Sequence, residues 1–553
     1  MSAETAFAQA CDHHRNGRLF EAAALCRQVL GETPNDPAAQ HLLGVIGFGL
    51  GDAAAALKWL EKAVAADGAA AEHQHDLGRA YHAAGRFAEA AACQRRALDA
   101  RPDYAEAQFH LGNALAAQGE GKAAAGCYRA ALALRPEYAE AHANLGLMLA
   151  EDGRLDEAAA CYEAALRLDP GSAVTRNNLG NVHARRGDFA AAAALFEHAI
   201  RLDPGYVAPR INLGNAILEL GDPQTALACY DSALALAPDQ VEAHRNLGLV
   251  HLLLGDYSAG WREWRWPAPG PRRFAQPEWR GEPLRGEPIL LYAEQGFGDV
   301  LQFVRYAPLV AACGGRVILE VPAELRRLLA GMPGTETVVA CGDALPEFTS
   351  HCSLLSLPLA FKTELGTIPA AVPYIRVPAA AALPHPGGDG LRVGLVWAGR
   401  PEHNRDRLRS LPLAALAPLA DVPGVVFYSL QKGPAAEQLA GAPLPLVDLS
   451  PRITDFADTA AAVAALDLVI SVDTSVGHLA GALGKKVWLL LSYVPDWRWL
   501  LGRDDSPWYP TARLFRQPAG GDWAAVATNI TAALKALVAE AARGGPALSR
   551  TIY

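Results

Sequence analysis

A short hydroxyl-rich turn after a buried strand is the feature of this sequence with the clearest chemical use. Residues 466–470 are apolar apart from one aspartate and predict a buried parallel strand. Residues 473–475, Asp-Thr-Ser, follow as a turn, and the small and apolar residues 476–483 predict a helix packed on a sheet, with Gly477 allowing close approach of backbone or ligand. Free N–H groups and the helix dipole would then converge on one spot, as an anion such as phosphate requires. An ordinary strand-to-helix turn with a capping hydroxyl explains the same pattern.

A glycine loop follows another apolar run. Residues 289–293 predict a buried strand, residues 294–299 (Glu-Gln-Gly-Phe-Gly-Asp) a loop, and residues 300–312 a helix. Ligands of open α/β sheets bind at the carboxyl ends of the strands, which is where this loop would lie. The loop lacks the third glycine of the dinucleotide fingerprint, so we do not expect a dinucleotide, although Glu320 ends the next strand about where a ribose-binding acid would lie.

The C-terminal half as a whole alternates predicted strands and helices, which is typical of parallel α/β sheets. We expect two Rossmann-like lobes, lobe 1 at residues 289–378 and lobe 2 at residues 390–545. The stretch between them is rich in Pro, Ala and Gly and predicts a linker. Residues 266–288 contain six prolines, which exclude a regular helix, and their tryptophans Trp266 and Trp279 suggest a junction that is packed down.

The N-terminal half, residues 1–265, has a period of 34 residues. Glycines recur at this spacing, each preceded by leucine, with alanine twelve residues after all but the last of them and proline at the end of most units. This pattern resembles the tetratricopeptide repeat, which implies paired helices stacked into a superhelix whose concave face binds extended partners. The phased glycines are Gly44, Gly78, Gly112, Gly146, Gly180, Gly214 and Gly248.

Asparagines recur two residues before these glycines, and a second series follows them. A carboxamide both donates and accepts, so such a ladder could pair with the main chain of a peptide whatever its sequence. The alternative is that the asparagines satisfy neighbouring groups within the array. The ladder is Asn144, Asn178, Asn212 and Asn246, preceded by Asp76 and His110 at the same repeat position, and the second series is Asn113, Asn181 and Asn215.

Composition limits the remaining classes. A chain of 553 residues exceeds one hydrophobic core, so we expect two to four domains. The net charge of −10 argues against nucleic-acid partners and against a membrane-surface binder. We find no signal-peptide pattern near the first residue and no apolar run of the length of a membrane span, so a cytoplasmic location is the default. The nine cysteines lack metal-like spacing, and neither disulfides nor zinc are expected.

Three motifs carry a further resemblance. Residues 296–299 (GFGD), 397–399 (WAG) and 473–485 (DTSVGHLAGALGK) look like those of bacterial GT-B glycosyltransferases of the heptosyltransferase type. The order of a tetratricopeptide array and then a GT-B domain is similar to O-GlcNAc transferases and to bacterial fused enzymes, including flagellin glycosyltransferases. The resemblance implies a GT-B fold with an acceptor-side lobe 1 and a lobe 2 that binds a nucleotide-sugar. It also implies that the asparagine ladder holds the acceptor polypeptide.

The resemblance also implies roles for individual residues. Asp299 would be the general base that takes the proton of the acceptor hydroxyl during inversion at the anomeric carbon. It could equally cap its helix, and the two roles are compatible. The turn would contact the donor phosphates, but Ser475 stands where the family has glycine. Enzymes of this class neutralise the leaving diphosphate with side chains, so we expect no catalytic metal and no cofactor other than the donor substrate. The candidate donor contacts are Gln295, Gly298, Arg400, Lys432, Asp473, Thr474, Ser475, Gly477 and His478, with Arg405, Arg407 and Arg409 as further cations.

Three functions fit these observations. The leading one is transfer of a sugar from a nucleotide-sugar to a Ser or Thr hydroxyl of a protein held by the array, and a flagellin or other surface protein before export is its sharpest version. The second transfers the sugar to a lipid-linked saccharide or polysaccharide. The third is a scaffold whose lobes have lost their chemistry. The asparagine ladder favours the first over the second, and the joint presence of Asp299, the 473–475 turn and Lys432 argues against the third.

Overall fold

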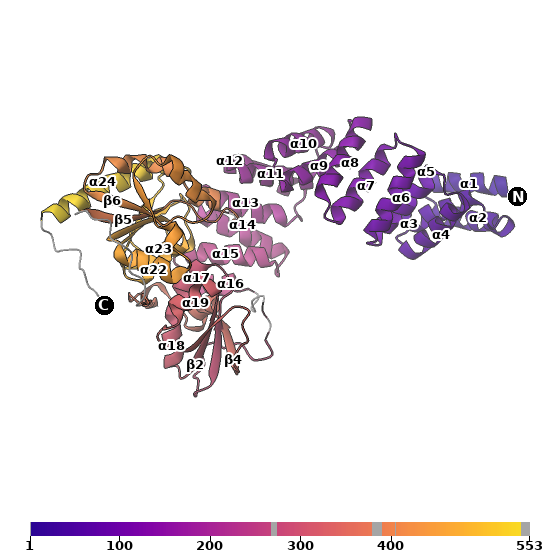
Figure 1. The fold of residues 1–553 in the computed structure, drawn as a ribbon. Helices are drawn as coiled ribbons and strands as arrows, with labels where there is room; N and C mark the ends of the chain where they lie inside the picture. Colours follow the sequence, from indigo (N-terminus) through magenta and orange to yellow (C-terminus); the bar gives the residue numbers. More distant parts are fainter. Residues whose placement is uncertain (1, 267–271, 273, 379–389, 404, 544–553) are drawn as a thin grey trace. The chain divides into compact units, whose positions relative to one another are not determined.

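The computed structural model describes residues 2–266, 272, 274–378, 390–403 and 405–543. In these residues the chain forms stacked helix pairs followed by two α/β lobes with parallel sheets (Figure 1). The chain divides into two compact units, residues 1–212 and residues 213–553. The second unit contains the last helix pairs together with both lobes, so the division lies well before the proline-rich junction at which we expected the array to end.

The first unit consists of antiparallel helix pairs that repeat along the chain, as the 34-residue period predicts. The turn after the first helix of each pair contains a glycine with positive φ, for example Gly119 (φ 79°) and Gly153 (φ 79°), a conformation that side chains with a Cβ rarely adopt. The helices are α1 (Ala3–Arg15), α2 (Leu19–Glu32), α3 (Pro37–Gly49), α4 (Ala53–Ala66), α5 (Ala71–Ala83), α6 (Phe87–Ala100), α7 (Ala105–Ala117), α8 (Gly121–Leu134), α9 (Ala139–Glu151), α10 (Leu155–Leu168), α11 (Ala173–Arg186) and α12 (Phe189–Leu202).

The phased glycines let the two helices of a pair touch. A Cβ at Gly112 would lie 2.6 Å from Tyr128, and one at Gly180 would lie 2.5 Å from Phe196, so any larger residue would push the helices apart. The aromatic side chains are themselves buried, with exposed fractions of 2% for Tyr128 and 1% for Phe196. In these repeats a glycine of the first helix therefore packs directly against a large aromatic residue of the second.

Helix α13 (Ala208–Glu219) crosses the division, and α14 (Pro223–Leu236), α15 (Val241–Leu253) and α16 (Tyr257–Trp264) belong to the second unit. Helix α16 packs into the lobes. Trp261 is 1% exposed and donates through Nε1 to the carbonyl of Thr363 at 2.9 Å, while the hydroxyl of Tyr257 accepts from Trp508 Nε1 at 3.0 Å. The last repeat is thus part of the core of the second unit.

Of the two junction tryptophans, Trp279 is buried at 4% exposure, as predicted, whereas Trp266 is 44% exposed and lies against the ring of His244. Residues 267–271 and 273 of the junction, and residues 379–389 of the predicted interlobe linker, lie outside the described residues.

Lobe 1 contains a four-stranded parallel sheet in the order β3-β2-β1-β4. The strands are β1 (Pro288–Tyr292), β2 (Arg316–Val321), β3 (Thr335–Ala340) and β4 (Ser350–Ser353), and the last of these has no clear signal in the sequence. The predicted helix after the glycine loop is broken into α17 (Phe297–Phe303), a 3-10 turn, and α18 (Ala307–Ala312), while α19 (Ala323–Leu329) and α20 (Leu357–Ala360) complete the lobe.

Lobe 2 contains a six-stranded parallel sheet in the order β10-β9-β8-β5-β6-β7. The order reverses between β5 and β8, which is the switch point at which such sheets bind ligands. The elements are β5 (Leu391–Val396), α21 (Asp406–Arg409), β6 (Val425–Ser429), β7 (Leu446–Asp448), α22 (Phe456–Ala465), β8 (Leu468–Val472), α23 (Ser475–Ala482), β9 (Val487–Leu491), β10 (Ala512–Arg516) and α24 (Trp523–Ala542).

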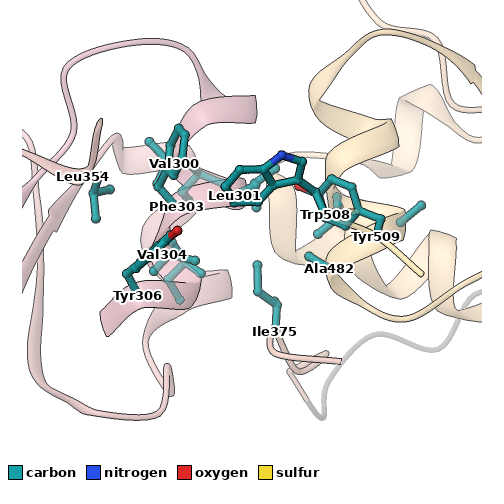
Figure 2. Packing of buried hydrophobic residues seen from close by; sticks show 14 of the residues in the cluster. Val300, Leu301, Phe303, Val304, Tyr306, Leu354, Ile375, Ala482, Trp508 and Tyr509 are labelled. Carbon is teal, nitrogen blue, oxygen red and sulfur yellow. The ribbon is translucent and has the colours of Figure 1, made fainter. Parts of the chain in front are cut away.

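A single apolar core joins the lobes. Figure 2 shows Trp508 and Tyr509 of lobe 2 lying beside the helical residues Val300 to Tyr306 of lobe 1, with Ile375 between the two. Trp508 and Tyr509 are fully buried. These two aromatic residues therefore serve mainly as packing between the lobes.

Helix α24 is the one helix in the described part of the chain that is long and apolar enough to cross a membrane. Its residues Val526, Ile530 and Leu534 pack into the core of lobe 2. A core helix of this composition passes the same length test, so this feature is weak evidence for a membrane span.

Candidate active site

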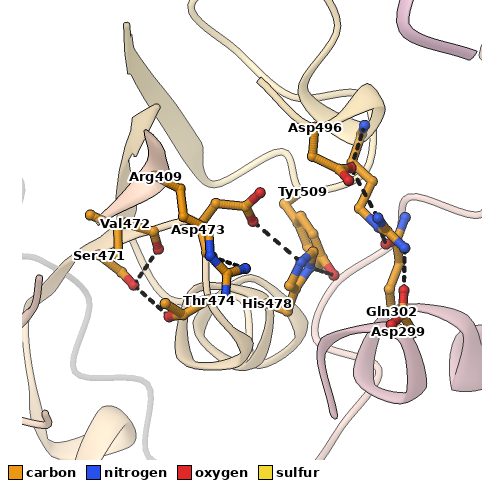
Figure 3. A network of polar contacts seen from close by, with 11 residues as sticks. Asp299, Gln302, Arg409, Ser471, Val472, Asp473, Thr474, His478, Asp496 and Tyr509 are labelled. Atoms are coloured by element: carbon orange, nitrogen blue, oxygen red, sulfur yellow. Dashed lines mark hydrogen bonds and ion pairs between the residues drawn. The ribbon is translucent and has the colours of Figure 1, made fainter. Parts of the chain in front are cut away.

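Asp299 lies in the first turn of α17, directly after the glycine loop that follows β1. Gly296 is the N-cap residue of this helix and has no side chain with which to cap it. The Asp299 carboxylate accepts hydrogen bonds from the N–H groups of Gly296 and of Asp299 itself, so it does help to cap the helix. The Asp299 carboxylate also forms an ion pair with the guanidinium of Arg498, which belongs to lobe 2. Figure 3 shows Asp299 and Gln302 of lobe 1 near Asp496 of lobe 2. The predicted catalytic carboxylate therefore sits where the two lobes meet.

The turn after β8 has the form that the sequence predicts. Thr474 is the N-cap residue of α23, but its hydroxyl lies 2.9 Å from Ser471 Oγ and makes no capping bond to the helix. The N–H groups of the first turn of α23 are therefore left for a ligand or water. A Cβ at Gly477 would lie 2.7 Å from Leu489, so this glycine permits the helix to pack on β9.

His478 connects the turn with lobe 1. Its Nδ1 lies 2.9 Å from the Tyr509 hydroxyl and its Nε2 lies 3.8 Å from Asp473 Oδ1. Its ring stacks on Trp499 with 5.3 Å between the ring centres. A Cβ at Gly298 would lie 2.9 Å from its Cδ2. The glycine of the lobe 1 loop is thus what lets this histidine of lobe 2 approach the helix that carries Asp299.

Two carboxylates, those of Asp299 and Asp496, pair with the guanidinium of Arg498, and Asp473 interacts with it electrostatically without direct contact. Burial raises the pKa of Asp299, and Arg498 opposes that rise. Burial, reinforced by the charge of Asp496, raises the pKa of Asp473 to about 6. Burial alone would raise the pKa of Asp496 too, but its ion pair and hydrogen bonds with Arg498 lower it overall.

His478 is neutral at physiological pH, because burial and then the charge of Arg498 lower its pKa to about 3. Its contact with Asp473 is therefore not an ion pair. Its Nδ1 is within hydrogen-bond distance of the Tyr509 hydroxyl, whereas the 3.8 Å from its Nε2 to Asp473 Oδ1 is too long for a hydrogen bond.

Other predicted donor contacts are spread more widely. Gln295 is exposed on the glycine loop. Arg400 lies over the ring of Phe297, which places it at the lobe boundary. Lys432 donates to the carbonyls of Ile453 (2.7 Å) and Ser450 (3.2 Å), so its ammonium group is used in ordering its own lobe.

Among the additional arginines, Arg409 is the one beside the turn. Its Nη1 donates to the carbonyl of Asp473 at 3.2 Å, and its Nε pairs with Asp406 at 3.2 Å. Arg405 contacts Glu219 of α13 at 3.0 Å and the carbonyl of Val494, and Arg407 is exposed.

The asparagine ladder is partly used within the array. The Nδ2 atoms of Asn144, Asn212 and Asn246 each donate to a neighbouring asparagine at 2.9 Å, and the acceptors are Asn113, Asn177 and Asn215 respectively. The fourth member, Asn178, lies 3.5 Å from Asn177 Nδ2 through its Oδ1. Each donated bond takes one of the two N–H groups of a carboxamide, so internal support and ligand contact are compatible.

Four residues of the site were not singled out as polar groups from sequence: Gln302, Asp496, Arg498 and Tyr509. Residues 496–499 (DWRW) have the composition of an aromatic patch, and they form a 3-10 turn whose arginine side chain is 9% exposed. An arginine with a neighbouring aspartate inside an otherwise apolar stretch was the available signal, because buried charges require partners.

We expect Gly298→Ala to disturb the approach of the lobes. The added methyl group would meet the buried His478 at 2.9 Å, so the variant should lose about 1–3 kcal/mol of stability. Thermal unfolding measures the loss. Gly296→Ala, two residues away, is the control, because its Cβ would meet nothing nearer than Asp299 at 3.6 Å. Equal melting temperatures for the two variants would contradict this packing.

A cavity of about 330 Å³ lies elsewhere in lobe 2, where Arg513 and Phe515 of β10 and Asn529 of α24 contribute to its walls. None of the residues above lines it, and the chemistry of the molecule is not placed there. In the residues that the structure describes, no three His, Cys, Asp or Glu side chains gather as a metal site would require.

Comparison with known proteins bears on the repeats. Tetratricopeptide repeat models match residues 7–71, 137–204 and 183–247, and a TPR repeat model matches residues 78–119 and 112–153. Protein FlbA of Caulobacter vibrioides is 29% identical over 298 residues, which cover 46% of this chain and 48% of the relative. The chain thus spans about half the length of the curated relative that it matches.

Solved tetratricopeptide structures are also similar. YrrB, described as a TPR protein with an unusual peptide-binding site, is 24% identical and covers 33% of this chain and 95% of its own, with a TM-score of 0.30. A thermophilic TPR protein of Thermus thermophilus is 24% identical and covers 33% of this chain and 99% of its own, with a TM-score of 0.28. By the family models, the matched N-terminal part of this chain is a tetratricopeptide repeat array, and two parallel α/β lobes of GT-B-like layout follow it.

Proposed function

We propose that the protein is a glycosyltransferase that moves a sugar from a nucleotide-sugar to a Ser or Thr hydroxyl of a protein bound by the repeat array. The observation that carries the proposal is that the segments after β1 of lobe 1 and after β8 of lobe 2 lie close together at the boundary between the lobes. Asp299, after β1 of lobe 1, is ion-paired with Arg498 of lobe 2, and its neighbour Gly298 lies against His478 on the helix that follows the 473–475 turn. A catalytic carboxylate and an anion-binding helix terminus at the carboxyl ends of two parallel sheets fit a two-lobed transferase.

The proposed reaction is a single displacement. The acceptor oxygen forms a bond to the anomeric carbon of the donor while the bond from that carbon to the diphosphate oxygen breaks. The hydroxyl proton passes to the Asp299 carboxylate, and the nucleoside diphosphate leaves with the electron pair. Burial favours this step because a carboxylate with a raised pKa is a stronger base than an exposed one.

The leaving group needs positive potential, and α23 supplies it. The first-turn N–H groups of α23 have no side-chain cap, and the helix dipole adds to their charge. Arg409 lies beside the same turn. In this proposal Asp473 faces sugar hydroxyls rather than the diphosphate, because its carboxylate would repel a second anion, and His478 lies beside it.

The repeat array supports a protein acceptor. Tetratricopeptide arrays bind peptides and proteins, and the carboxamides of Asn144, Asn178 and Asn212 recur at the 34-residue period of the array. A flagellin or another surface protein before export, modified in the cytoplasm, is the sharpest form of the proposal.

Replacing Asn144, Asn178 and Asn212 together by Ala tests the acceptor. We expect KM for a protein acceptor to rise at least tenfold, because each lost main-chain contact contributes about 0.5–1.5 kcal/mol, while hydrolysis of the donor stays unchanged. Glu163→Gln with Glu197→Gln, on the second helices of their pairs, is the control. An unchanged KM would favour the lipid-linked or polysaccharide acceptor.

A scaffold function is the second candidate, and one observation favours it. Lys432 donates to two carbonyls and Asp299 is held in an ion pair, so both groups have structural partners. Failure of every nucleoside diphosphate to bind would support the scaffold.

A further inference from the structure

Arg498 has an unusual set of partners for a buried side chain. Its side chain is 9% exposed, and it makes charged or polar contacts with both lobes. It bonds Asp299 through Nη2 and Gln302 through Nε, both on α17 of lobe 1, and Asp496 of its own lobe through Nη1 at 2.9 Å. Its guanidinium also lies 4.5 Å from the ring centre of Trp497.

This arrangement fixes the Asp299 side chain from the opposite lobe. Gln302 lies one turn after Asp299 on the same helix, so Arg498 forms hydrogen bonds with two residues of α17. A planar guanidinium can do this because its N–H groups point in fixed directions, which an ammonium group cannot imitate. Asp496 supplies the second carboxylate that a buried guanidinium between two lobes requires.

We propose that Arg498 is the positioning residue for the base, holding the Asp299 carboxylate in place and ionised across the boundary between the lobes. The inference rests on the proposed function, in which Asp299 accepts the proton. Arg498 touches neither reacting atom in this account and acts only through Asp299.

The surroundings of Asp299 define the expected direction of the pH effect. The charged or titratable groups near it are Arg498 and Asp496, on the loop after β9, and Asp473 and His478, at the turn after β8. Arg305, on the 3-10 turn after α17, does not face Asp299, because it donates to the carbonyls of Gln302 and Trp508. Burial raises the pKa of Asp299 and Arg498 lowers it. Removing the positive charge therefore raises the pKa further, and a higher pH is needed to ionise the base.

The pH profile of kcat/KM tests the proposal. We expect Arg498→Gln to move the acid limb upward by more than about one pH unit and to reduce the plateau at least tenfold. In Arg498→Lys the acid limb should lie close to its wild-type pH, because the positive charge is restored. The plateau of kcat/KM should stay low, because lysine cannot bond Asp299 and Gln302 at the same time. An unmoved limb in Arg498→Gln would overturn the proposal.

Arg305 provides the matched control. It is also a buried arginine between the lobes, 4% exposed, and it donates to the carbonyl of Trp508 at 2.7 Å and to the Tyr374 hydroxyl at 2.8 Å without contacting Asp299. Arg305→Gln should lower the melting temperature and leave the acid limb where it is. If the acid limb of kcat/KM shifts by the same number of pH units in both variants, Arg498 acts only by holding the lobes together.

A stability measurement tests the same contact without any catalysis. A carboxyl group whose folded pKa lies above its unfolded value destabilises the fold as the pH rises through that range. The loss in melting temperature caused by Arg498→Gln should thus be larger at pH 7.5 than at pH 5. This difference between the two pH values should become smaller when Asp299→Asn is also present. The part that remains is expected to come from the ion pair of Arg498 with Asp496. A difference that is the same in both backgrounds would overturn the proposal. If the wild type transfers no sugar but this cycle shows the coupling, the proposed function fails while the contact stands.

Discussion

Asp299→Asn is expected to reduce sugar transfer by about 10²–10⁴-fold, the usual contribution of a positioned general base. Asparagine keeps the size of the side chain and can still accept from Arg498, but it cannot take a proton from the acceptor hydroxyl. The loss should appear in kcat. Binding of the nucleoside diphosphate, which the account places on α23 of lobe 2, should be unchanged.

Glu336→Gln is the control for this variant, since Glu336 is an exposed carboxylate of lobe 1 paired with Arg316 at 3.2 Å. It should transfer sugar at the wild-type rate. Wild-type turnover in Asp299→Asn would remove Asp299 from the mechanism and leave it as an interlobe ion-pair partner. A melting temperature that falls severely would instead mean that the lost rate reflects unfolding.

Ser475→Pro is expected to weaken nucleoside diphosphate binding by about 10–100-fold. Ser475 is the first residue of α23, a position where proline is well tolerated because its missing N–H would have no partner within the helix. Thr474 before it already has the extended backbone that proline requires, with φ −138° and ψ 168°. The variant therefore removes one amide donor from the anion site while keeping the helix, and a hydrogen bond to a charged group contributes about 1.5–3 kcal/mol.

Ser475→Ala separates the amide from the hydroxyl, because alanine retains the N–H group. Isothermal titration should give it an affinity within a few-fold of the wild type. Equal affinities for Ser475→Pro and the wild type would place the diphosphate elsewhere.

The repeats could be predicted from sequence almost completely. Their period is local, and each glycine and its large partner, such as Gly112 and Tyr128, lie within one unit, so spacing alone determines the contact. Parallel strands of the lobes could also be predicted where the apolar run was long, as in β1 and β8. Short strands such as β4 and β7 have too few residues for a periodic signal.

The site was predictable only in part. The glycine loop and the turn are local motifs, and the structure places both at the lobe boundary. Arg498 could not be assigned, because its partner Asp299 lies about two hundred residues earlier and the pairing depends on how the lobes meet. Lys432 shows the reverse case, in which a cation at a strand end has carbonyl partners that sequence does not reveal.

The most direct test of the central claim is a thermal-shift series of the full chain with UDP, GDP, ADP, CMP and dTDP, each with and without Mg²⁺. A ligand that binds the folded state raises the melting temperature by mass action. We expect one nucleotide to raise the melting temperature without metal, which would also identify the donor class. No shift with any nucleotide would contradict a working donor site and leave the scaffold as the better description.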